Sequence, residues 1–427
     1  MRNYDIVIIG GGPAGASTAL FLEKKGYLIA LLDQAFFPRD KVCGEFISPA
    51  ADDIFADLGI LKSIDAMNPT RLCGVALSSY EGTCYQVNYP DSADGRTMRS
   101  LSLERSILDN LMIDQVRNSN VQLMEGFRVT DLLFEGGNVC GVKGYDQTKT
   151  KFNIKAKLVI DAGGRNSISL RRLNLRRHSY GRKKIALAAH WKNVEELGGY
   201  CYMHISRPGY TGIAPLKGNK ANVVLVVDKY FLAGADIEQF YIKTVLGNRE
   251  RRRILGSGIP VEKIRAVDSL AYSVKKPSCG GLLLVGDAMG FIDPFTGEGI
   301  YMSLRSSQLA VDTVQNAFDR SDFSAKNLNN YYLLRKKEFR EKNILSKILQ
   351  HLIYRPSLCS QVVEALAAEK ELSSMLIGAI GDYVPAKKLI CFKYFLRLFE
   401  RVLKQYQIKR FDTGRILLTK ELRSGRK

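Results

Sequence analysis

The sequence lacks the features that would assign it to a membrane-spanning, secreted or metal-binding class. Its 427 residues contain no uninterrupted apolar run of about 18 residues, which argues against a membrane-spanning helix. The eight cysteines form no CxxC pair and show no Cys/His ligand spacing, so neither a disulfide framework nor a metal site is expected. The first residues lead directly into an apolar run and leave no room for a signal peptide. We therefore expect a cytoplasmic protein, or one peripheral to the inner face of a membrane.

Acidic residues are scarce toward the carboxyl end. The formal net charge is +20, and residues 384–427 hold 13 Lys and Arg against 3 Asp and Glu, which gives +10. Within this segment, Lys388 to Lys404 has a helical pattern that is apolar over most of its surface. Lys393, Arg397, Glu400 and Lys404 follow one another at spacings of four, three and four, which places them in one narrow polar stripe.

Two hypotheses account for this helix. It packs on the protein's own core with its charged stripe in water, or it lies on an anionic membrane, where each nearby Lys or Arg contributes roughly 1 kcal/mol. Residues 384–427 are therefore a candidate peripheral membrane contact. No nucleic-acid-binding motif accompanies the basic residues, so nucleic acid is not an expected partner.

The amino-terminal segment carries a dinucleotide-binding fingerprint. Tyr4 to Ile9 is a short apolar run that predicts a buried strand, and Ala16 to Lys25 has a helical composition. Between them, Gly10 permits a tight turn, Gly12 lets a pyrophosphate approach the backbone, and Gly15 lets the helix pack closely on the strand. The segment therefore predicts the first unit of a Rossmann-type fold.

The same unit indicates how the nucleotide is held. The amino terminus of the helix, which includes Pro13 and Ala14, offers free N–H groups and a partial positive charge to phosphates. A second apolar run, Tyr27 to Leu32, ends in Asp33, close to the offset of about 20 residues at which a carboxylate meets ribose hydroxyls. Asp33 favours an unphosphorylated adenosine ribose. The fingerprint alone does not separate FAD from NAD.

A second nucleotide-cofactor signature lies far downstream. Leu282 to Val285 predicts a buried strand that ends at Gly286 and Asp287. Residues 293–300 then read Asp-Pro-Phe-Thr-Gly-Glu-Gly-Ile and lead into a predicted helix from Gly299 to Phe318. Two such signatures in one chain point to FAD.

Four motifs in order resemble one known superfamily. They are the glycine turn at Gly10 to Gly15, the loop at Pro38 to Glu45, the segment Asp161 to Ser167, and the segment Gly286 to Gly299. Together they resemble the flavoprotein monooxygenase superfamily with the para-hydroxybenzoate hydroxylase fold. More narrowly, they resemble its geranylgeranyl-reductase-like branch, which also contains polyketide-associated oxidoreductases and flavin halogenases. The resemblance implies FAD as the cofactor and NAD(P)H as the reductant.

The resemblance also implies roles for individual residues. Arg39 and Arg105 would contact the flavin cofactor, and Asp161 and Gly163 stand where the family has an element that serves FAD and NAD(P)H together. Cys43 would lie near the flavin, either as a catalytic proton donor or as a small buried side chain. The complete set of predicted cofactor-binding residues is Gly10, Gly12, Pro13, Ala14, Gly15, Asp33, Arg39, Cys43, Gly44, Arg105, Asp161, Gly163, Gly286, Asp287, Gly297, Glu298, Gly299 and Ile300.

The chemical roles in the second signature follow from its place in the chain. Asp287, at a strand end, is expected to hydrogen-bond ribityl hydroxyls. The amides of Gly297, Glu298 and Gly299 open a helix whose positive end can face the pyrophosphate or the reacting end of the flavin. This position would stabilise the negative charge of reduced flavin.

The predicted fold is α/β: a discontinuous Rossmann-type FAD-binding domain, an inserted antiparallel β-sheet substrate domain and a helical, basic carboxyl-terminal region. We assign the FAD-binding domain to 1–80, 101–180 and 276–325, the substrate domain to 81–100 and 181–275, and the carboxyl-terminal region to 326–427. Leu101 to Arg117 is expected to be a helix, and Val121 to Tyr145 a hairpin. Pro356 and Pro385 are expected to interrupt the later helices.

The inserted segment bears on the reaction. Pro208 to Pro215 corresponds to a stretch in which many geranylgeranyl reductases carry a tryptophan that Gly212 replaces here, so a more open flavin edge is expected. Trp191 is the sole tryptophan, and the motif of tryptophan halogenases is absent, which argues against indole halogenation. His190 and His204 lie on the inserted strands, either as structural residues or as acid/base groups.

The predicted function is that of an FAD-dependent oxidoreductase. NAD(P)H-reduced flavin would act on a lipophilic small molecule, with hydroxylation of an aromatic or polyketide-like substrate preferred. One alternative is reduction of carbon–carbon double bonds in an isoprenoid, and another is membrane-associated electron transfer to a quinone. The chain has no second glycine fingerprint, so NAD(P)H is expected to bind transiently.

Overall fold

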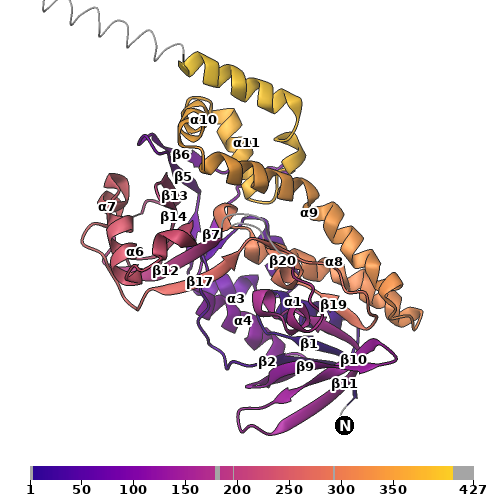
Figure 1. The fold of residues 1–427 in the computed structure, drawn as a ribbon. Helices are drawn as coiled ribbons and strands as arrows, with labels where there is room; N and C mark the ends of the chain where they lie inside the picture. The colour runs from indigo at the N-terminus through magenta and orange to yellow at the C-terminus, as the bar shows by residue number, and fades with distance from the viewer. Residues whose placement is uncertain (1–2, 178–182, 196, 292–293, 407–427) are drawn as a thin grey trace, which may run out of the picture.

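The computed structural model describes residues 3–177, 183–195, 197–291 and 294–406, and two large sheets with their covering helices make up most of it (Figure 1). The parallel part of the first sheet has the order β8-β2-β1-β11-β19. These strands are β1 (Asn3–Ile9), β2 (Ile29–Asp33), β8 (Gln122–Glu125), β11 (Lys151–Asp161) and β19 (Leu282–Leu284). The far-downstream strand β19 therefore joins the amino-terminal strands, and the FAD-type domain is discontinuous as predicted.

A hairpin extends the first half of β11. It consists of β9 (Arg128–Glu135) and β10 (Asn138–Tyr145), and β10 pairs antiparallel with β11. The predicted hairpin from Val121 to Tyr145 was therefore too long. Residues Gln122–Glu125 pair in parallel with β2 instead, because the chain crosses over to that edge through a helix.

Three helices pack on one face of the parallel sheet. They are α1 (Pro13–Glu23), α4 (Arg105–Arg117) and α8 (Gly299–Asp319), and their apolar sides share one core with β1, β2 and β19. The helix predicted from Leu101 begins only at Arg105. Leu101 lies instead in the strand β7 (Ser100–Ser102), which pairs with β3 (Phe46–Ile47) and β4 (Thr70–Leu72). The backbone groups of Leu101 are hydrogen-bonded to these strands, so the helix cannot begin there.

The second sheet has the order β16-β12-β15-β14-β13-β5-β6, with β17 also paired to β12. Its strands are β5 (Gly74–Ser78), β6 (Cys84–Asn88), β12 (Lys184–Lys192), β13 (Tyr200–Ser206), β14 (Gly209–Leu216), β15 (Lys220–Asp228), β16 (Ile259–Pro260) and β17 (Arg265–Leu270). The predicted domain limits stay predictions. The pairing of β5 with β13 nonetheless puts a strand from the segment 1–80 into this sheet.

Helices cover both faces of the second sheet. One face packs on α6 (Ile237–Leu246) and α7 (Arg249–Leu255), with Trp191 and Tyr241 in the shared core. The other face meets α9 (Ala325–Ile353) and α10 (Pro356–Ala368), which are followed by α11 (Lys370–Ile380). Residues 392–406 form a further helix, and Pro356 begins α10 as the sequence indicated.

The smaller elements connect these layers. They are α2 (Ala51–Asp57), α3 (Leu61–Ala66), α5 (Ile168–Arg172), β18 (Tyr272–Ser273) and β20 (Gly290–Phe291). None of the helices within the described ranges is both long and apolar enough to cross a membrane. The predicted basic carboxyl-terminal segment extends to residue 427, and its part after residue 406 lies outside the described residues.

Small residues bring α1 and α8 into close contact. The hydroxyls of Ser17 and Thr18 donate to Oγ of Ser307 at 2.8 and 2.9 Å, and the Ser307 hydroxyl in turn approaches the carbonyl oxygen of Ala14 at 2.9 Å. Ser307 is fully buried. A larger side chain at this position would therefore push the two helices apart.

We predict that Ser307→Leu destabilises the protein by about 1–3 kcal/mol, because it overpacks the contact between α1 and α8. Thermal or denaturant unfolding measures the change. Asn316→Leu, at an exposed position of α8, is the matched control and should leave stability nearly unchanged. Equal effects of the two substitutions would contradict a tightly packed interface at Ser307.

Candidate active site

A cavity of about 1040 Å³ lies where the carboxyl ends of β1, β11 and β19 face the second sheet. Ligands of open α/β sheets bind at this edge. All the predicted cofactor-binding residues line the cavity except Gly15 and Asp161. Asp293, which belongs to the downstream motif, lies outside the described residues.

The glycine turn shapes one end of the cavity. Gly10 has φ +98, and a Cβ there would lie 2.8 Å from the carbonyl oxygen of Ala162. A Cβ on Gly15 would lie 1.7 Å from the carbonyl oxygen of Gly10, so Gly15 serves helix packing and stands behind the cavity wall. Gly12 differs, because a Cβ there would meet only Nη2 of Arg39 at 3.7 Å. The backbone at Gly12 therefore faces open space.

The amino terminus of α1 is available to an anion. Gly12 is its N-cap residue, and within the described chain no side chain hydrogen-bonds to this cap. Pro13 occupies the first turn, where its missing N–H costs nothing. The uncapped amides and the positive end of the helix dipole thus face the cavity together, which is the arrangement that binds a diphosphate.

Asp33 organises the adjoining turn. Its two oxygens accept hydrogen bonds from the amide nitrogens of Gly11, at 2.7 Å, and Ala35, at 2.8 Å. The side chain still lines the cavity. Because a carboxylate offers about four lone-pair sites, Asp33 keeps acceptor capacity for ribose hydroxyls.

Arg39 and Arg105 converge on one buried acid that the sequence analysis did not single out. Nε and Nη2 of Arg105 donate to the two oxygens of Asp109 at 2.8 Å each, and Nη1 of Arg39 lies 3.3 Å from Asp109 Oδ2. Burial opposes the charge of Arg105, but Asp109 and Cys43 together outweigh burial and raise the pKa of Arg105. The spacing of four residues between Arg105 and Asp109 in a predicted helix is the sequence feature that could have indicated this ion pair.

The downstream signature meets the upstream one directly. Gly286 has φ +59, and a Cβ there would lie 2.7 Å from the Cβ of Ala14 in α1. Next to it, burial raises the pKa of Asp287 to about 6, against the opposing pull of cations that include Arg105 and Lys41. Gly297 has φ +72 and packs against the Phe46 ring, since a Cβ there would meet Cδ1 at 2.5 Å. Glycine is therefore required both at Gly286, where the downstream signature begins, and at Gly297, near its end.

Asp161 lies beneath the cavity wall. Its oxygens accept hydrogen bonds from the amide nitrogens of Gly163 and Ser169 and from the hydroxyls of Ser167 and Ser169, at 2.6–2.9 Å. The side chain is fully buried. Asp161 therefore shapes the loop that presents Gly163 to the cavity. Its predicted direct contact with the cofactor has no support in this geometry.

The wall also carries buried guanidinium nitrogens that make no hydrogen bond among the described residues. They belong to Arg176 and Arg335, and to Arg39, whose Nη1 has the 3.3 Å ion pair with Asp109; all three residues line the cavity. The Arg176 guanidinium lies 4.1 Å from the centre of the Tyr272 ring, and the Tyr272 hydroxyl donates to the carbonyl oxygen of Asp287. Buried donors of this kind fit an anionic ligand. The residues present therefore fit a dinucleotide with a diphosphate.

The other end of the cavity is apolar. The second sheet forms one side of this chamber, and α9, α10 and α11 form the other. Representative lining residues are Ile205, Tyr210 and Val226 from the sheet, and Ile353, Val363 and Ile377 from the helices. Helical periodicity predicts these helices, but nothing in their sequence places them at the cavity.

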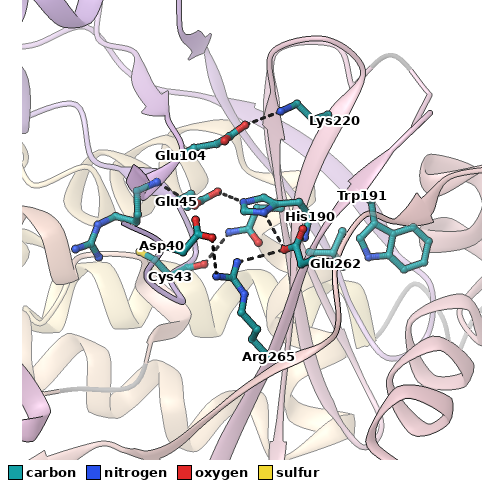
Figure 2. A network of polar contacts seen from close by, with 12 residues as sticks. Asp40, Cys43, Glu45, Glu104, His190, Trp191, Lys220, Glu262 and Arg265 are labelled. Carbon is teal, nitrogen blue, oxygen red and sulfur yellow. Dashed lines mark hydrogen bonds and ion pairs between the residues drawn. The ribbon is translucent and has the colours of Figure 1, made fainter. Parts of the chain in front are cut away.

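A polar network holds the loop that carries Cys43 against the second sheet (Figure 2). His190, on β12, has one carboxylate at each ring nitrogen: Glu45 Oε2 lies 2.8 Å from Nε2, and Glu262 Oε1 lies 2.9 Å from Nδ1. Only the imidazolium can donate from both nitrogens. Burial works against the charge, but Glu45 and Glu262 raise the pKa of His190.

Further contacts anchor the same loop. Asn222 donates to the carbonyl oxygen of Cys43 at 2.7 Å, and Arg265 lies 3.7 Å from Asp40. Glu45 also accepts a hydrogen bond from the backbone N–H of Arg105. Cys43 and Gly44 line the cavity, whereas neither Glu45 nor His190 does. The network therefore positions the loop, and a catalytic role of Cys43 stays a prediction.

His204 and Trp191, which also lie on the inserted strands, are structural residues. Burial lowers the pKa of His204 to about 3, its Nδ1 lies 2.7 Å from the Ser78 hydroxyl, and it does not line the cavity. Trp191 points away from its neighbour His190 into the core of the second sheet (Figure 2). Neither residue takes part in the candidate site.

A second buried charge cluster joins the site to the carboxyl-terminal helices. Nζ of Lys342, on α9, lies 3.4 Å from Glu298 Oε1 and also contacts Asp382. Burial, and to a smaller degree Asp382, raises the pKa of Glu298 to about 7, although Lys342 opposes the shift. Glu298 precedes α8 and lines the cavity. No sequence pattern indicates this cluster, because Glu298, Lys342 and Asp382 lie on three separate elements.

These features together define an FAD-dependent oxidoreductase. The chain belongs to the family described as FAD binding domain, whose model matches residues 3–310. It is 24% identical to a 1H-pyrrole-2-carbonyl-(peptidyl-carrier protein) chlorinase of Pseudomonas fluorescens, over 77% of this chain and 80% of that protein. It is 27% identical to digeranylgeranylglycerophospholipid reductase 1 of Methanococcoides burtonii, over 77% and 78% of the two chains.

A solved structure shares the fold along almost the whole chain. The flavoprotein/dehydrogenase from Cytophaga hutchinsonii superposes with a TM-score of 0.83 at 18% identity, covering 95% of this chain and 100% of that one. The predicted α/β architecture with a helical carboxyl-terminal region is thus confirmed. The narrower branch of the superfamily is left open, because halogenases and reductases both occur among the relatives.

We predict that Gly12→Asp weakens FAD binding at least about tenfold, because a carboxylate at the N-cap of α1 repels the diphosphate and competes for its amides. Gly12 has φ −73 and ψ −175, which other residues adopt, and Asp is a favoured N-cap residue. The FAD-free protein should therefore remain folded. Gly12→Asn, of the same shape without the charge, is the matched control. Flavin fluorescence titration measures the affinities, and equal losses in both variants would contradict the electrostatic explanation.

We predict that the stabilisation contributed by His190 is complete below the ordinary pKa of 6.5 and disappears as the pH rises through its higher folded value. The sign follows because folding raises this pKa, so the folded protein holds the proton more tightly. His190→Gln should therefore lower the melting temperature more at about pH 6 than at about pH 9. A difference that is constant over this range would show that the imidazolium is not what holds the loop.

Proposed function

We propose that the protein transfers oxygen from O2 to a lipophilic small molecule of aromatic or polyketide-like character, with NAD(P)H as the reductant of its FAD. The continuity of the cavity carries this proposal. A single hollow extends from the glycine turn to the apolar chamber between the second sheet and α9–α11. Burial in such a chamber contributes roughly 25 cal/mol per Å² of the substrate's apolar surface.

The chamber has room next to the second sheet. A Cβ placed on Gly212 would meet only Cε of Met203, at 3.8 Å, and Gly212 lines the cavity. A substrate ring could occupy the space that a large side chain would fill at this position. This openness favours an aromatic or polyene substrate over a small polar one.

The residues of this chain would bind and orient the reactants. Bound FAD supplies two-electron redox chemistry, including the reduction of O2. The amides at Gly12 and Ala14 would hold its diphosphate, and Asp33 and Asp287 would accept hydrogen bonds from its hydroxyls. The apolar walls would exclude water from the reacting atoms.

The likeness to a chlorinase supports an oxidative reaction, and the likeness to a reductase supports a rival reaction. Replacing C–H by C–Cl, as a chlorinase does, oxidises the substrate, and hydroxylation is an oxidation of the same order. The likeness to a digeranylgeranylglycerophospholipid reductase favours the second candidate, reduction of carbon–carbon double bonds in an isoprenoid. The two candidates differ in whether O2 is consumed with the substrate.

The decisive experiment follows the fate of oxygen. The FAD-loaded protein is supplied with NADPH or NADH and with isotopically labelled O2, using an aryl polyene and geranylgeraniol as probes. We predict a product of the aryl polyene that has gained one labelled oxygen atom and is not formed anaerobically. Anaerobic gain of two hydrogen atoms by geranylgeraniol would contradict this and favour the reductase. Electron transfer to a quinone without either product would favour the electron-transfer alternative.

The variant Gly212→Phe tests the substrate chamber within the same assay. It should strongly reduce product formation while FAD binding and its reduction by the nicotinamide nucleotide persist. Lys217→Phe, at an exposed position just after β14, is the control for adding the same ring. Unchanged turnover in Gly212→Phe would show that the substrate does not bind in this chamber.

A further inference from the structure

The helix over residues 392–406 attaches to the protein by one side. Tyr394 is 7% exposed, and its hydroxyl donates to the carbonyl oxygen of Leu372 on α11 at 3.0 Å. On the same side, Arg397 donates to Glu371 at 2.8 Å, and Arg401 donates to the carbonyl oxygen of Ala368 at 2.7 Å. The side that faces the protein therefore includes two arginines of this basic segment.

The opposite side is apolar and faces outward. Phe392 is 81% exposed and Phe399 is 58% exposed. The complete outward apolar set is Phe392, Phe395, Leu396, Phe399, Leu403 and Tyr406. At 3.6 residues per turn, these six side chains fall within an arc of about 100°. They form one continuous apolar face, and we refer to these six residues as the outward face.

The alternative in which this helix buries its apolar residues in the protein's own core does not fit the described structure. Only Tyr394 of the helix is fully buried, and Leu398 is partly buried against the carboxyl-terminal core. Figure 1 shows the helix at the end of the molecule opposite the amino-terminal sheet. A contiguous exposed apolar face of this kind marks a contact with another surface.

The charges around the outward face point to an anionic partner. Lys393 and Lys404 are exposed along one edge of the helix together with a single acid, Glu400, and Lys387 and Lys388 are exposed just before the helix, so the basic residues outnumber the acid. The segment 384–427 carries a net charge of +10. A second copy of this chain would bring the same positive segment to the contact, and the two would repel each other. A lipid surface with anionic headgroups instead satisfies both the apolar face and its basic edge.

We propose that residues 392–406 bind the surface of an anionic lipid bilayer, with the outward face among the acyl chains and the lysines at the headgroups. This association is a property of the helix and does not depend on which reaction the flavin performs. The helix lies in the plane of the interface, as expected for an amphipathic helix that does not cross the bilayer.

Vesicle sedimentation of the full-length FAD-loaded protein tests the proposal. Vesicles of phosphatidylcholine and phosphatidylglycerol in equal parts should bind the protein, and vesicles of phosphatidylcholine alone should bind it much more weakly. The double variant Phe395→Ser with Phe399→Ser should lose about tenfold or more in binding, because it removes two rings from the interface. Its melting temperature and FAD content should stay unchanged, since both residues are exposed.

Leu333→Ser is the matched control, since Leu333 lies on α9 and is 58% exposed, as Phe399 is. It should bind vesicles like the unchanged protein. Equal binding of the double variant and the control would overturn the proposal, and so would equal binding to both types of vesicle. A dimer in lipid-free solution that the double variant dissociates would overturn it in favour of a second copy of the chain. Loss of binding in the double variant alone, without such a dimer, supports the lipid surface.

Discussion

The packing of the start of α1 against the Gly286 turn and against the first half of α8 is the constraint on which the site depends. Gly286 lies against Ala14 so closely that a Cβ would come within 2.7 Å, and the Ser307 hydroxyl joins the two helices further along. Small side chains permit this approach, and backbone and hydroxyl hydrogen bonds then fix it. As a consequence, the amino termini of both helices face one cavity, although they are far apart in the sequence. Two positive helix ends and the carboxyl edge of a parallel sheet together select an anionic dinucleotide before any side chain is considered.

The sequence predicted well those features whose physical cause is local. Gly10 has φ +98 and Gly286 has φ +59, values that glycine adopts most readily. Because each turn itself requires glycine, the spacing of the motif was enough to locate both residues. Asp161 shows the limit of this approach. It occupies the expected position, but four hydrogen bonds turn its carboxylate inward to hold residues 163–169. Which way a strand-end carboxylate points depends on donors elsewhere in the fold, and a motif does not record them.

Features that arise from distant pairing were not predicted. Helical periodicity located most of the carboxyl-terminal helices, but it gave no sign that α9–α11 would close an apolar chamber against the second sheet. Likewise, Glu298 belongs to a recognised motif, whereas its partner Lys342 comes from α9 and Asp382 from the turn after α11. The sequence also does not show that His190 has two carboxylate partners, because Glu45 lies on the loop before β3 and Glu262 on the segment before β17. In both cases the partner residues determine the charge of the side chain, and these partners can be identified only from the tertiary structure.

The chamber and the helix over residues 392–406 share α11 as a common wall. The carbonyl oxygen of Leu372 holds Tyr394, while Leu376 and Ile377, about one turn further along α11, line the cavity. A helix held at the level of lipid headgroups would therefore keep this wall close to the bilayer, where a hydrophobic compound is far more concentrated than in water. The same orientation would leave the parallel sheet, at the opposite end of the molecule in Figure 1, exposed to water. If the helix binds a bilayer in this way, a water-soluble nicotinamide nucleotide and a membrane-soluble substrate would approach one flavin from different phases. The position of the helix would then bear on catalysis without any contact between the helix and the reacting atoms.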